Sequence, residues 1–220
     1  MSAAPAPQGG SRRGWLGRLI YWLLVFMVWG IIAVMGVIVW YAYDLPSVDK
    51  LSAIQRKPSI TLLDHKGRKV AEFGDVYGVP VQLNQLPKHL PRAVVATEDR
   101  RFYSHYGVDP IGLTRALVNN LWAGRIVQGG STISQQLAKN VFLTHQRTLK
   151  RKVQEFLLAL WLEANFSKDQ ILTLYLNRVY LGAGAYGVDA AARRYFSKPA
   201  AKVNLAEAAM LAGLLKAPSR

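Results

Sequence analysis

The chain has 220 residues, of which 51% are hydrophobic and 10% aromatic, so it can bury the core of a medium-sized domain and is not a disordered protein. Its formal net charge of +15 indicates anionic partners, which are nucleic acid, acidic lipid headgroups or a phosphorylated substrate. The absence of cysteine excludes a disulfide framework and a thiolate metal site.

An uncharged, apolar run covers residues 19–43. About 20 apolar residues cross a bilayer as a helix, whereas a cleavable signal peptide has an apolar stretch of only about 7 to 15. We therefore expect a retained transmembrane signal anchor, with a buried helix of a soluble protein as the alternative. The positive-inside bias places Arg12, Arg13 and Arg18, in a tail at residues 1–18, on the cytoplasmic side. The rest of the chain is then extracytoplasmic, on the periplasmic side, which makes nucleic acid the least expected partner.

A short β element is expected next, within a linker at residues 44–86. Residues 60–63 and 68–73 have strand character, and Gly67 between them supplies the positive φ of a turn. From residue 87 to residue 220 the patterns are helical. The expected helices cover residues 91–98, 111–122, 131–142, 149–161, 168–177 and 190–196, and a last one follows Asn204. The sequence thus predicts a mainly α domain behind a single transmembrane helix and a small β-hairpin.

The predicted helix at residues 131–142 has a polar face. Its apolar residues recur four apart, which leaves a face available to a ligand, made of Thr132, Gln135, Gln136 and Lys139. Gly129 and Gly130 precede the helix, so free backbone N–H groups at its start are expected to bind phosphate oxygens.

The next helix is expected to bury a wide apolar stripe, made of Leu149, Val153, Phe156, Leu157, Leu160 and Trp161. Glu155 falls outside this stripe and is expected to point, together with Thr148, Arg151 and Lys152, into a polar space.

Two carboxylates on different elements, Glu98 and Glu155, indicate acid–base chemistry on an anionic substrate. In glycosyl chemistry one carboxylate takes a proton from an attacking hydroxyl, while the other assists on the opposite side of the sugar. A diphosphate departs as an anion and needs cations more than a proton donor. The candidate cations are Lys139, Arg147, Arg151 and Lys152.

Simpler interpretations stay open at this point. Glu155 lies three and four residues after two cations, a spacing that is common in surface ion pairs. His105 can be an ordinary, partly buried histidine, and Gln135 and Gln136 can be solvated helix surface. Phe102 is expected to pack rather than to react.

Four polar blocks together resemble the family 51 peptidoglycan glycosyltransferases, found in class A penicillin-binding proteins and in monofunctional relatives. Residues 98–107, EDRRFYSHYG, match the family's E-D-x-x-F-x-x-H-x-G, and residues 130–136, GSTISQQ, match G-S-T-I-x-Q-Q. Residues 151–155, RKVQE, match R-K-x-x-E, and residues 168–177 match K-x-x-I-L-x-x-Y-L-N. The collinear match extends from about residue 60 to residue 219.

The resemblance implies a lysozyme-like fold that polymerises lipid II into β-1,4 glycan strands and releases undecaprenyl pyrophosphate. It implies that Glu98 is the base and that Glu155 assists departure of the leaving group, through a divalent cation such as Mg²⁺ or Mn²⁺. It further implies a donor site lined by Ser131, Gln135, Gln136, Lys139, Arg147, Lys152 and Asn177. Asp99, Phe102, His105 and Arg151 are additional candidates. The apolar stretch at residues 111–126 would approach lipid tails.

The resemblance also implies partners and a membrane setting. The partners are lipid II, the growing lipid-linked strand, the bilayer and other cell-wall synthesis proteins. Residues 180–187 resemble the bifunctional class A branch, so the chain is expected to be the amino-terminal part of such a protein and to stop short of the domain's end. Ser47 and Lys50 fit S-x-x-K without the motifs that accompany it, which we interpret as coincidence. The rival functions are a lysozyme-like or lytic glycan-cleaving enzyme and an inactive membrane-anchored scaffold.

Overall fold

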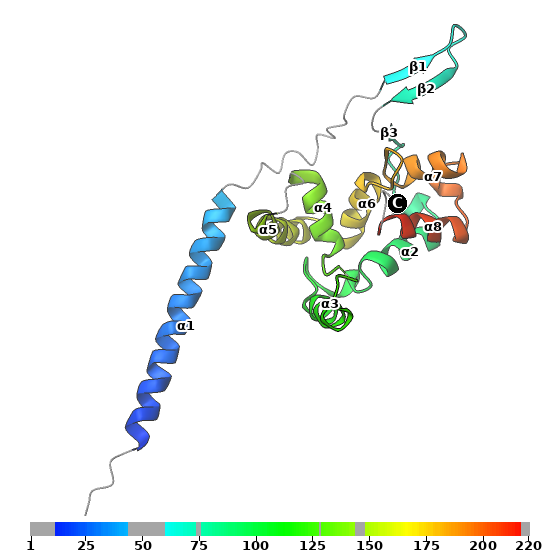
Figure 1. The fold of residues 1–220 in the computed structure, drawn as a ribbon. Helices are drawn as coiled ribbons and strands as arrows, with labels where there is room; N and C mark the ends of the chain where they lie inside the picture. The colour runs from blue at the N-terminus through cyan, green and yellow to red at the C-terminus, as the bar shows by residue number, and fades with distance from the viewer. Residues whose placement is uncertain (1–11, 44–59, 74–75, 128, 144–147, 217–220) are drawn as a thin grey trace, which may run out of the picture. The chain divides into compact units, whose positions relative to one another are not determined.

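The computed structural model describes residues 12–43, 60–73, 76–127, 129–143 and 148–216. It divides into two compact units, residues 1–45 and 46–220, which are considered separately below (Figure 1). Ser47, Lys50 and Arg147 of the sequence analysis lie outside the described residues.

The first unit holds one long helix, α1 (Arg12–Tyr43). It begins before the predicted apolar run, because arginine and leucine are good helix formers and the hydrogen-bond ladder continues through them. Its segment Gly17–Tyr41 has a mean hydropathy of 2.7, and by length and composition it can cross a membrane. The predicted apolar helix is therefore present.

The second unit begins with an antiparallel hairpin, in which β1 (Ile60–Leu63) pairs with β2 (Lys69–Phe73). Gly67 has a φ of 74°, as the predicted turn requires. The Asp64 carboxylate accepts hydrogen bonds from the backbone N–H groups of Lys66 and Arg68, both at 2.8 Å. The hairpin was thus predicted correctly.

A mainly α body follows, as the composition and periodicity predicted. Its helices are α2 (His89–Glu98), α3 (Pro110–Ala123), α4 (Ile133–Phe142), α5 (Leu149–Asn165), α6 (Lys168–Arg178), α7 (Val188–Phe196) and α8 (Leu205–Leu214). Short 3-10 turns lie at Leu83–Gln85, Phe102–Ser104 and Ala200–Lys202. Side-chain caps begin four of these helices, at Thr132, Thr148, Ser167 and Asn204.

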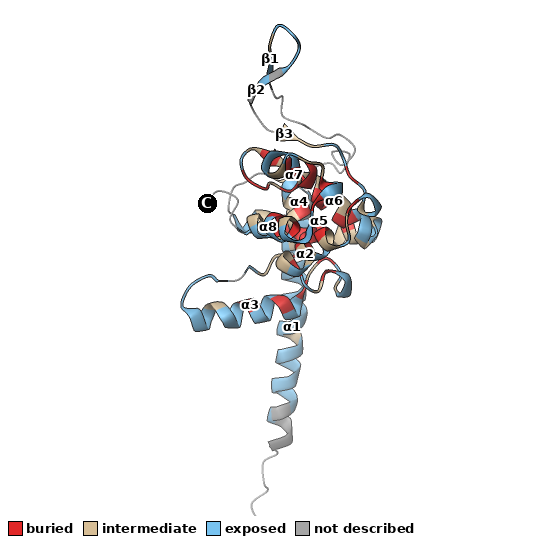
Figure 2. Cartoon of the chain, turned by 90° about the vertical axis from the view of Figure 1, so that its right-hand side faces the viewer, coloured by how far each residue is buried: buried red, intermediate tan, exposed pale blue. Residues whose placement is uncertain are grey.

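The core forms around α4, which packs against α5 and α6, while α2 packs against α8 (Figure 1). Leu137 of α4, Leu162 of α5 and Tyr175 of α6 are fully buried. In Figure 2 the buried residues gather in these helices, whereas α3 is exposed along most of its length. The body therefore has one well-packed part and one helix that is largely unpacked.

A parallel pairing between β3 (Val76–Tyr77) and β4 (Ala185–Tyr186) was not predicted. Two-residue strands are too short to show a period in the sequence. The Tyr77 and Tyr186 rings stack with centroids 5.2 Å apart. Residues from Val76 onward, which the sequence analysis placed in the linker, thereby join the helical body.

The buried face of α5 differs from the predicted apolar stripe. Leu158, Ala159 and Leu162 are buried, together with Gln154 and Glu155, whereas Leu149 is 85% exposed. Phe156, also in the stripe, is 38% exposed. The face of α5 that packs against α4 includes polar side chains that have partners. For this reason the widest apolar stripe of α5 is not its most buried face. The prediction for this stripe was wrong.

Candidate active site

Glu98 is the last residue of α2, and its carboxylate is held by a side chain of α4. Gln136 Nε2 donates to Glu98 Oε2 at 2.7 Å, and Tyr175 OH donates to Gln136 Oε1 at 3.1 Å. Burial raises the pKa of Tyr175, and the carboxylates of Glu98 and Asp99 raise it further, so the phenol stays protonated as a donor. The two bonds fix the Gln136 amide, and Glu98 Oε1 has no hydrogen-bond partner among the described residues.

Asp99, the next residue, ties the end of α2 to the start of α4. Its carboxylate lies 2.9 Å from Nε2 of His105 and accepts the Ile133 N–H at 3.0 Å. Both side chains are almost fully buried. Asp99 and His105 thus fix the position of Glu98 relative to α4. Because both side chains are buried, they are not a solvent-exposed pair.

Glu155 is only 2% exposed, which rules out the surface ion pair that its spacing allowed. Lys152 Nζ donates to Glu155 Oε2 at 2.9 Å and to Ser131 Oγ at 2.8 Å. Arg151 Nε lies 3.4 Å from Glu155 Oε1, and neither atom makes a hydrogen bond in the described structure. The cluster therefore holds cations with N–H donors still open to an anion.

Lys139 of α4 lies within electrostatic reach of both glutamates. Burial lowers its pKa, the carboxylates of Glu155 and Glu98 act in the opposite direction, and Arg151 and Lys152 add to the lowering. Glu98 and Glu155 thus share one strongly basic region built around α4.

The start of α4 differs from the expected phosphate site. The helix begins at Ile133, because Thr132 takes an extended conformation and caps it. The N–H groups of Thr132, Ile133 and Gln135 already donate to Gln135 Oε1, Asp99 Oδ2 and Thr132 Oγ1. These three groups are not free for phosphate oxygens, and phosphate binding by the rest of this segment stays a prediction. Gln135 is buried in this cap, whereas its neighbour Gln136 contacts Glu98.

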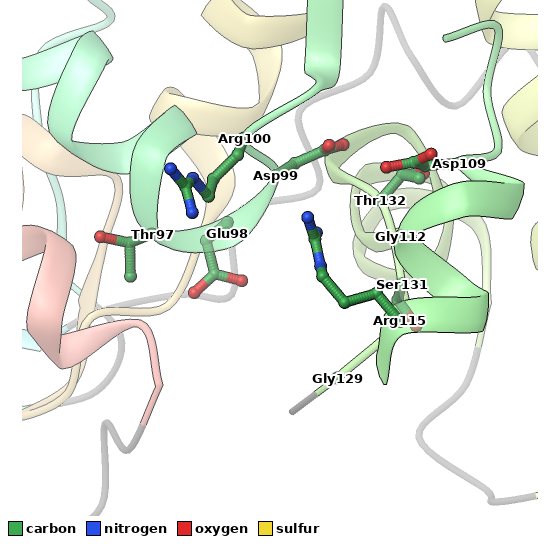
Figure 3. A pocket seen from close by; sticks show the side chains of 11 residues that line it. Thr97, Glu98, Asp99, Arg100, Asp109, Gly112, Arg115, Gly129, Ser131 and Thr132 are labelled. Carbon is green, nitrogen blue, oxygen red and sulfur yellow. The ribbon is translucent and has the colours of Figure 1, made fainter. Parts of the chain in front are cut away.

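A pocket of about 60 Å³ opens beside Glu98, between the end of α2, the first turns of α3 and the segment before α4 (Figure 3). Ser131, the hydrogen-bond partner of Lys152, also lines it, whereas Glu155 does not. Arg100 and Arg115 line it as well. The sequence analysis named neither as a site residue: Arg100 lies within the first matched block, whereas Arg115 stands alone in an apolar helix and gives no motif signal.

Phe102 packs rather than reacts, as expected. It is fully buried, and Lys168 Nζ lies 4.5 Å from the centre of its ring. Lys168 also donates to Glu163 Oε1 at 2.7 Å, and Ser134 donates to the same oxygen. This cluster joins the loop after Asp99 to α4, α5 and α6, which supports the position of Glu98.

The described contacts of Asn177 join it to residue 81 rather than to the glutamates. Its Oδ1 accepts the Val81 N–H at 2.8 Å, and its Nδ2 donates to the carbonyls of Val81 and Thr173, both at 2.8 Å. These bonds use the whole amide, so Asn177 clamps residues before α2 onto α6. Its place in the donor site stays a prediction.

The sequence of the chain is also similar to known proteins. A family model for transglycosylases matches residues 66–220. The chain belongs to the transglycosylase family. The resemblance that four motifs indicated is thereby confirmed, together with a mainly α, lysozyme-like fold class.

Similar proteins include penicillin-binding protein 1A of Vibrio cholerae, which is 44% identical over 202 residues, covering 92% of this chain and 24% of that protein. Penicillin-binding protein 1A of Aquifex aeolicus is 49% identical over 177 residues, covering 80% of this chain and 24% of its own length. Penicillin-binding protein 1A of Escherichia coli K12 is 47% identical over 176 residues, with 80% and 21% covered. The transglycosylase chain thus spans about a quarter of the length of these relatives.

The residues around Glu155 do not by themselves form a metal site in this transglycosylase. One carboxylate oxygen accepts from Lys152 and the other faces Arg151, whereas Mg²⁺ and Mn²⁺ need several oxygen ligands. Within the described ranges, no group of three or more His, Cys, Asp and Glu side chains is placed to hold a metal ion. The divalent cation stays a prediction, and no step below depends on it.

Proposed function

We propose that this transglycosylase is a peptidoglycan glycosyltransferase, which polymerises lipid II into β-1,4 glycan strands and releases undecaprenyl pyrophosphate. The observation that carries the proposal is the convergence of Glu98 and Glu155 on one basic region around α4, with Lys139 in reach of both. The relatives named penicillin-binding protein 1A support it.

Glu98 would act as the general base. Gln136 holds one carboxylate oxygen, which leaves Oε1 to accept the proton of the acceptor sugar's 4-hydroxyl. The acceptor oxygen then forms a bond to the anomeric carbon of the donor, from the face opposite the diphosphate. This single displacement converts an α-linked donor into a β-1,4 bond.

The Glu155 cluster would receive the leaving group. As the bond between the anomeric carbon and the diphosphate oxygen breaks, the electron pair stays with the diphosphate. Arg151, Lys152 and the half-buried Lys139 supply positive charge where that negative charge develops. Glu155 would orient Arg151 and Lys152, because it contacts both.

Glycosyl transfer from a lipid diphosphate and hydrolysis of glycan differ in the group that leaves the sugar. A lytic enzyme must protonate a sugar oxygen, for which it needs a carboxylic acid in an apolar setting. Glu155 instead lies next to two cations, Arg151 and Lys152, so its surroundings are not apolar. The arrangement therefore favours transfer from a diphosphate over cleavage of finished glycan.

The test is a lipid II polymerisation assay on the full chain and on its Glu98→Gln variant. We expect polymer from the wild type and a loss of about 100-fold or more in the variant, since general-base catalysis contributes about 10² to 10⁴ in rate. Asp64→Asn, in the hairpin turn, is the matched control and should polymerise normally. Full activity of Glu98→Gln, or cleavage of finished peptidoglycan by the wild type, would contradict the proposal.

The setting that this function requires is also proposed. The α1 helix would anchor the chain in the cytoplasmic membrane by a single pass, with the N-terminus cytoplasmic and the catalytic body on the periplasmic side. Lipid II, the growing lipid-linked strand and the bilayer would be its partners, alongside other cell-wall synthesis proteins. Nucleic acid would not bind as a partner.

A further inference from the structure

A hollow between the 3-10 turn at Leu83–Gln85 and the first half of α6, called the α6 groove below, lies away from Glu98. It has a volume of about 520 Å³, within the range of about 300 to 1,000 Å³ that is typical of ligand sites. Thr173 lines it two residues before Tyr175, whose hydroxyl donates to Gln136. Successive helix residues point about 100° apart, so the groove is on the opposite side of α6 from the Tyr175–Gln136 contact.

The α6 groove differs in charge from the rest of this basic protein. Asp169 is the only charged side chain among the described residues that line it, although the chain has 28 lysines and arginines. The pocket beside Glu98, by contrast, includes two arginines. Diphosphates and anionic headgroups therefore do not fit the groove. Its other polar side chains, which suit an uncharged ligand with hydroxyl and amide groups, are Gln82, Asn84, Gln170 and Thr173.

The polar side chains of the groove still have hydrogen-bonding capacity. Gln170 Oε1 accepts the Ser167 N–H at 2.8 Å in the cap of α6, which leaves the Gln170 NH₂ group to donate to a ligand. Asp169 accepts the Tyr103 hydroxyl through Oδ1 at 3.0 Å, so Oδ2 remains as an acceptor. The Asn84 amide has no hydrogen-bond partner among the described residues. The groove thus offers both donors and acceptors, as a hydroxyl-rich ligand requires.

The remaining lining of the groove is apolar, and its rim is open. Leu83, Phe166 and Leu174 supply apolar surface next to the polar groups, and a sugar ring has the same two parts, hydroxyl groups and an apolar C–H face. Asn84 and Gln170 are exposed, so the groove opens to solvent. An open groove can hold a few units of a polymer that continues beyond it, whereas an enclosed pocket cannot.

Asn177 fixes one wall of the groove relative to the other. From α6 its amide accepts the Val81 N–H and donates to the Val81 carbonyl, both at 2.8 Å. Val81 directly precedes Gln82 in the opposite wall. Because these bonds form within the protein itself, the groove exists before a ligand arrives, and less order has to be created on binding. Asn177, which has no described contact with the glutamates, thereby builds the groove.

Resting on the proposed function, we infer that the α6 groove is a second glycan site, which binds a few sugars of the growing strand on the side of α6 away from Glu98. The uncharged glycan backbone, with its hydroxyl and acetamido groups, has the chemistry that the lining fits. A strand that is held at two places leaves the enzyme less often between additions, because the second contact is intramolecular. The groove thus lengthens the strands without changing the chemical step.

The first measurement is the binding of a soluble β-1,4-linked N-acetylglucosamine tetramer to the full chain in detergent, by titration calorimetry. For Asn84→Ala we expect the Kd to rise about fivefold, the usual effect of losing a hydrogen bond between neutral groups. Gln170→Glu keeps the oxygen that caps α6 and loses the NH₂ donor, so it should raise the Kd as well.

Asn165→Ala is the matched control for the binding measurement. This exposed asparagine lies next to Phe166 but does not line the groove, and its amide donates to the Trp161 carbonyl. Its Kd should be that of the wild type. Glu98→Gln should also bind the tetramer as the wild type does, because the groove is separate from the catalytic carboxylate. Thermal unfolding shows that each variant is folded.

The second measurement is the length of the strands that the full chain makes from lipid II. For Asn84→Ala we expect lipid II consumption within about twofold of the wild-type rate and strands shorter by about twofold or more, since the strand is released earlier. Asn165→Ala should make strands of wild-type length.

The outcomes separate this inference from the proposed function. An unchanged Kd in Asn84→Ala and Gln170→Glu, an equal rise in Asn165→Ala, or a loss of tetramer binding in Glu98→Gln overturns the second glycan site. Competition by a peptide of alternating glycine and serine, as effective as the tetramer, would identify a peptide groove instead and also overturns it.

A raised Kd with strands of unchanged length overturns the role in holding the strand. In all these cases the wild type still polymerises lipid II, so the glycosyltransferase proposal stands. A folded wild type that makes no polymer overturns the proposed function, and the holding of a growing strand with it, whether or not the tetramer binds.

Discussion

Gln136 is the residue that connects the catalytic candidate to the core. An ionised carboxylate accepts hydrogen bonds but cannot donate them, so the amide group facing Glu98 must be the NH₂. The amide oxygen then faces Tyr175, whose hydroxyl donates to it. A fully buried phenol on α6 therefore determines which way an amide on α4 points, and the amide orients the base on α2.

We predict that Tyr175→Phe lowers kcat by about tenfold, because the Gln136 amide loses the bond that fixes it. The change also removes a part-buried hydrogen bond, which costs about 0.5 to 1.5 kcal/mol of stability. Polymerisation kinetics across pH and thermal unfolding measure the two effects separately.

Tyr103→Phe provides the comparison for this prediction. Tyr103 donates a hydrogen bond at 3.0 Å to Asp169, but at an exposed position away from Glu98. Its loss should leave kcat and the pH profile as in the wild type. If Tyr175→Phe keeps full kcat while its unfolding temperature falls, Tyr175 stabilises the fold without orienting the base.

Asp189 is expected to make the stability of the folded protein depend on pH in the acidic range. Burial alone would raise its pKa, but Arg193 and the backbone N–H groups of Ala200 and Val79 outweigh that effect, so the pKa lies below its ordinary value. A carboxylate with a lowered folded-state pKa stabilises the fold above its unfolded pKa of about 3.9, and this stabilisation disappears as the pH falls through the folded value.

Urea unfolding between about pH 2 and pH 6 tests this sign. Wild-type stability should decrease as the pH falls below about 4, and Asp189→Asn should be less stable near pH 6 but lose less stability on acidification. An equal acid dependence in both proteins would show that Asp189 is not the group responsible.

The sequence identified the chemistry-bearing residues better than it identified their contacts. Glu98, Gln136 and Glu155 were singled out by motif and Lys139 as a candidate cation, and the four lie around α4. Gln135 was assigned with its neighbour, yet it is part of a helix cap, because residues adjacent on a helix face directions about 100° apart. A motif shows which residues are present, but the direction in which each side chain points depends on how the helices pack.

At the scale of elements, α3 is the helix that the body packs least. Of its residues, Gly112 and Ala116 are buried, whereas Leu121 and Trp122 are 70% and 91% exposed. Isolated exposed apolar residues are normal, but a continuous apolar helix surface marks an interaction with protein or membrane. The lipid contact that the resemblance implied is consistent with this exposure.

We predict that α3 enters the lipid interface when the chain is reconstituted in vesicles. Because the chain has no cysteine, Leu121→Cys can carry a single environment-sensitive fluorophore. Its emission should shift to shorter wavelength relative to the same variant denatured in urea. A label at Lys202→Cys, on an exposed turn, should stay close to the emission in water, and an equal emission at both sites would argue against lipid contact.

Helix starts were easier to predict than helix faces. The capping boxes at Ser167 and Asn204 begin α6 and α8 where the sequence placed them, because capping is a local hydrogen-bond pattern. The apolar stripe of α5 did not predict its buried face, since burial depends on which neighbour the helix meets. Glu155 can be buried on that face because it forms ion pairs with Lys152 and Arg151. The periodicity of apolar residues does not predict such ion pairs.

At the scale of the whole molecule, a basic catalytic body and an apolar helix occur in one chain. Three arginines precede the apolar run and all 13 acidic residues follow it. Lys and Arg near the ends of a membrane helix are retained on the cytoplasmic side, which is the basis for the proposed orientation. The orientation determines whether the site can reach the proposed substrate, lipid II, on the outer surface of the membrane.

Single cysteines placed before and after α1 in the sequence test the orientation. In spheroplasts that express the full chain, a membrane-impermeant maleimide should label Ser197→Cys, in the exposed turn after α7, and should not label Ser11→Cys. After the membrane is permeabilised with detergent, both should react, which shows that each thiol is accessible. Labelling of Ser11→Cys in intact spheroplasts, with Ser197→Cys protected, would reverse the orientation and place the two glutamates on the side away from the proposed substrate.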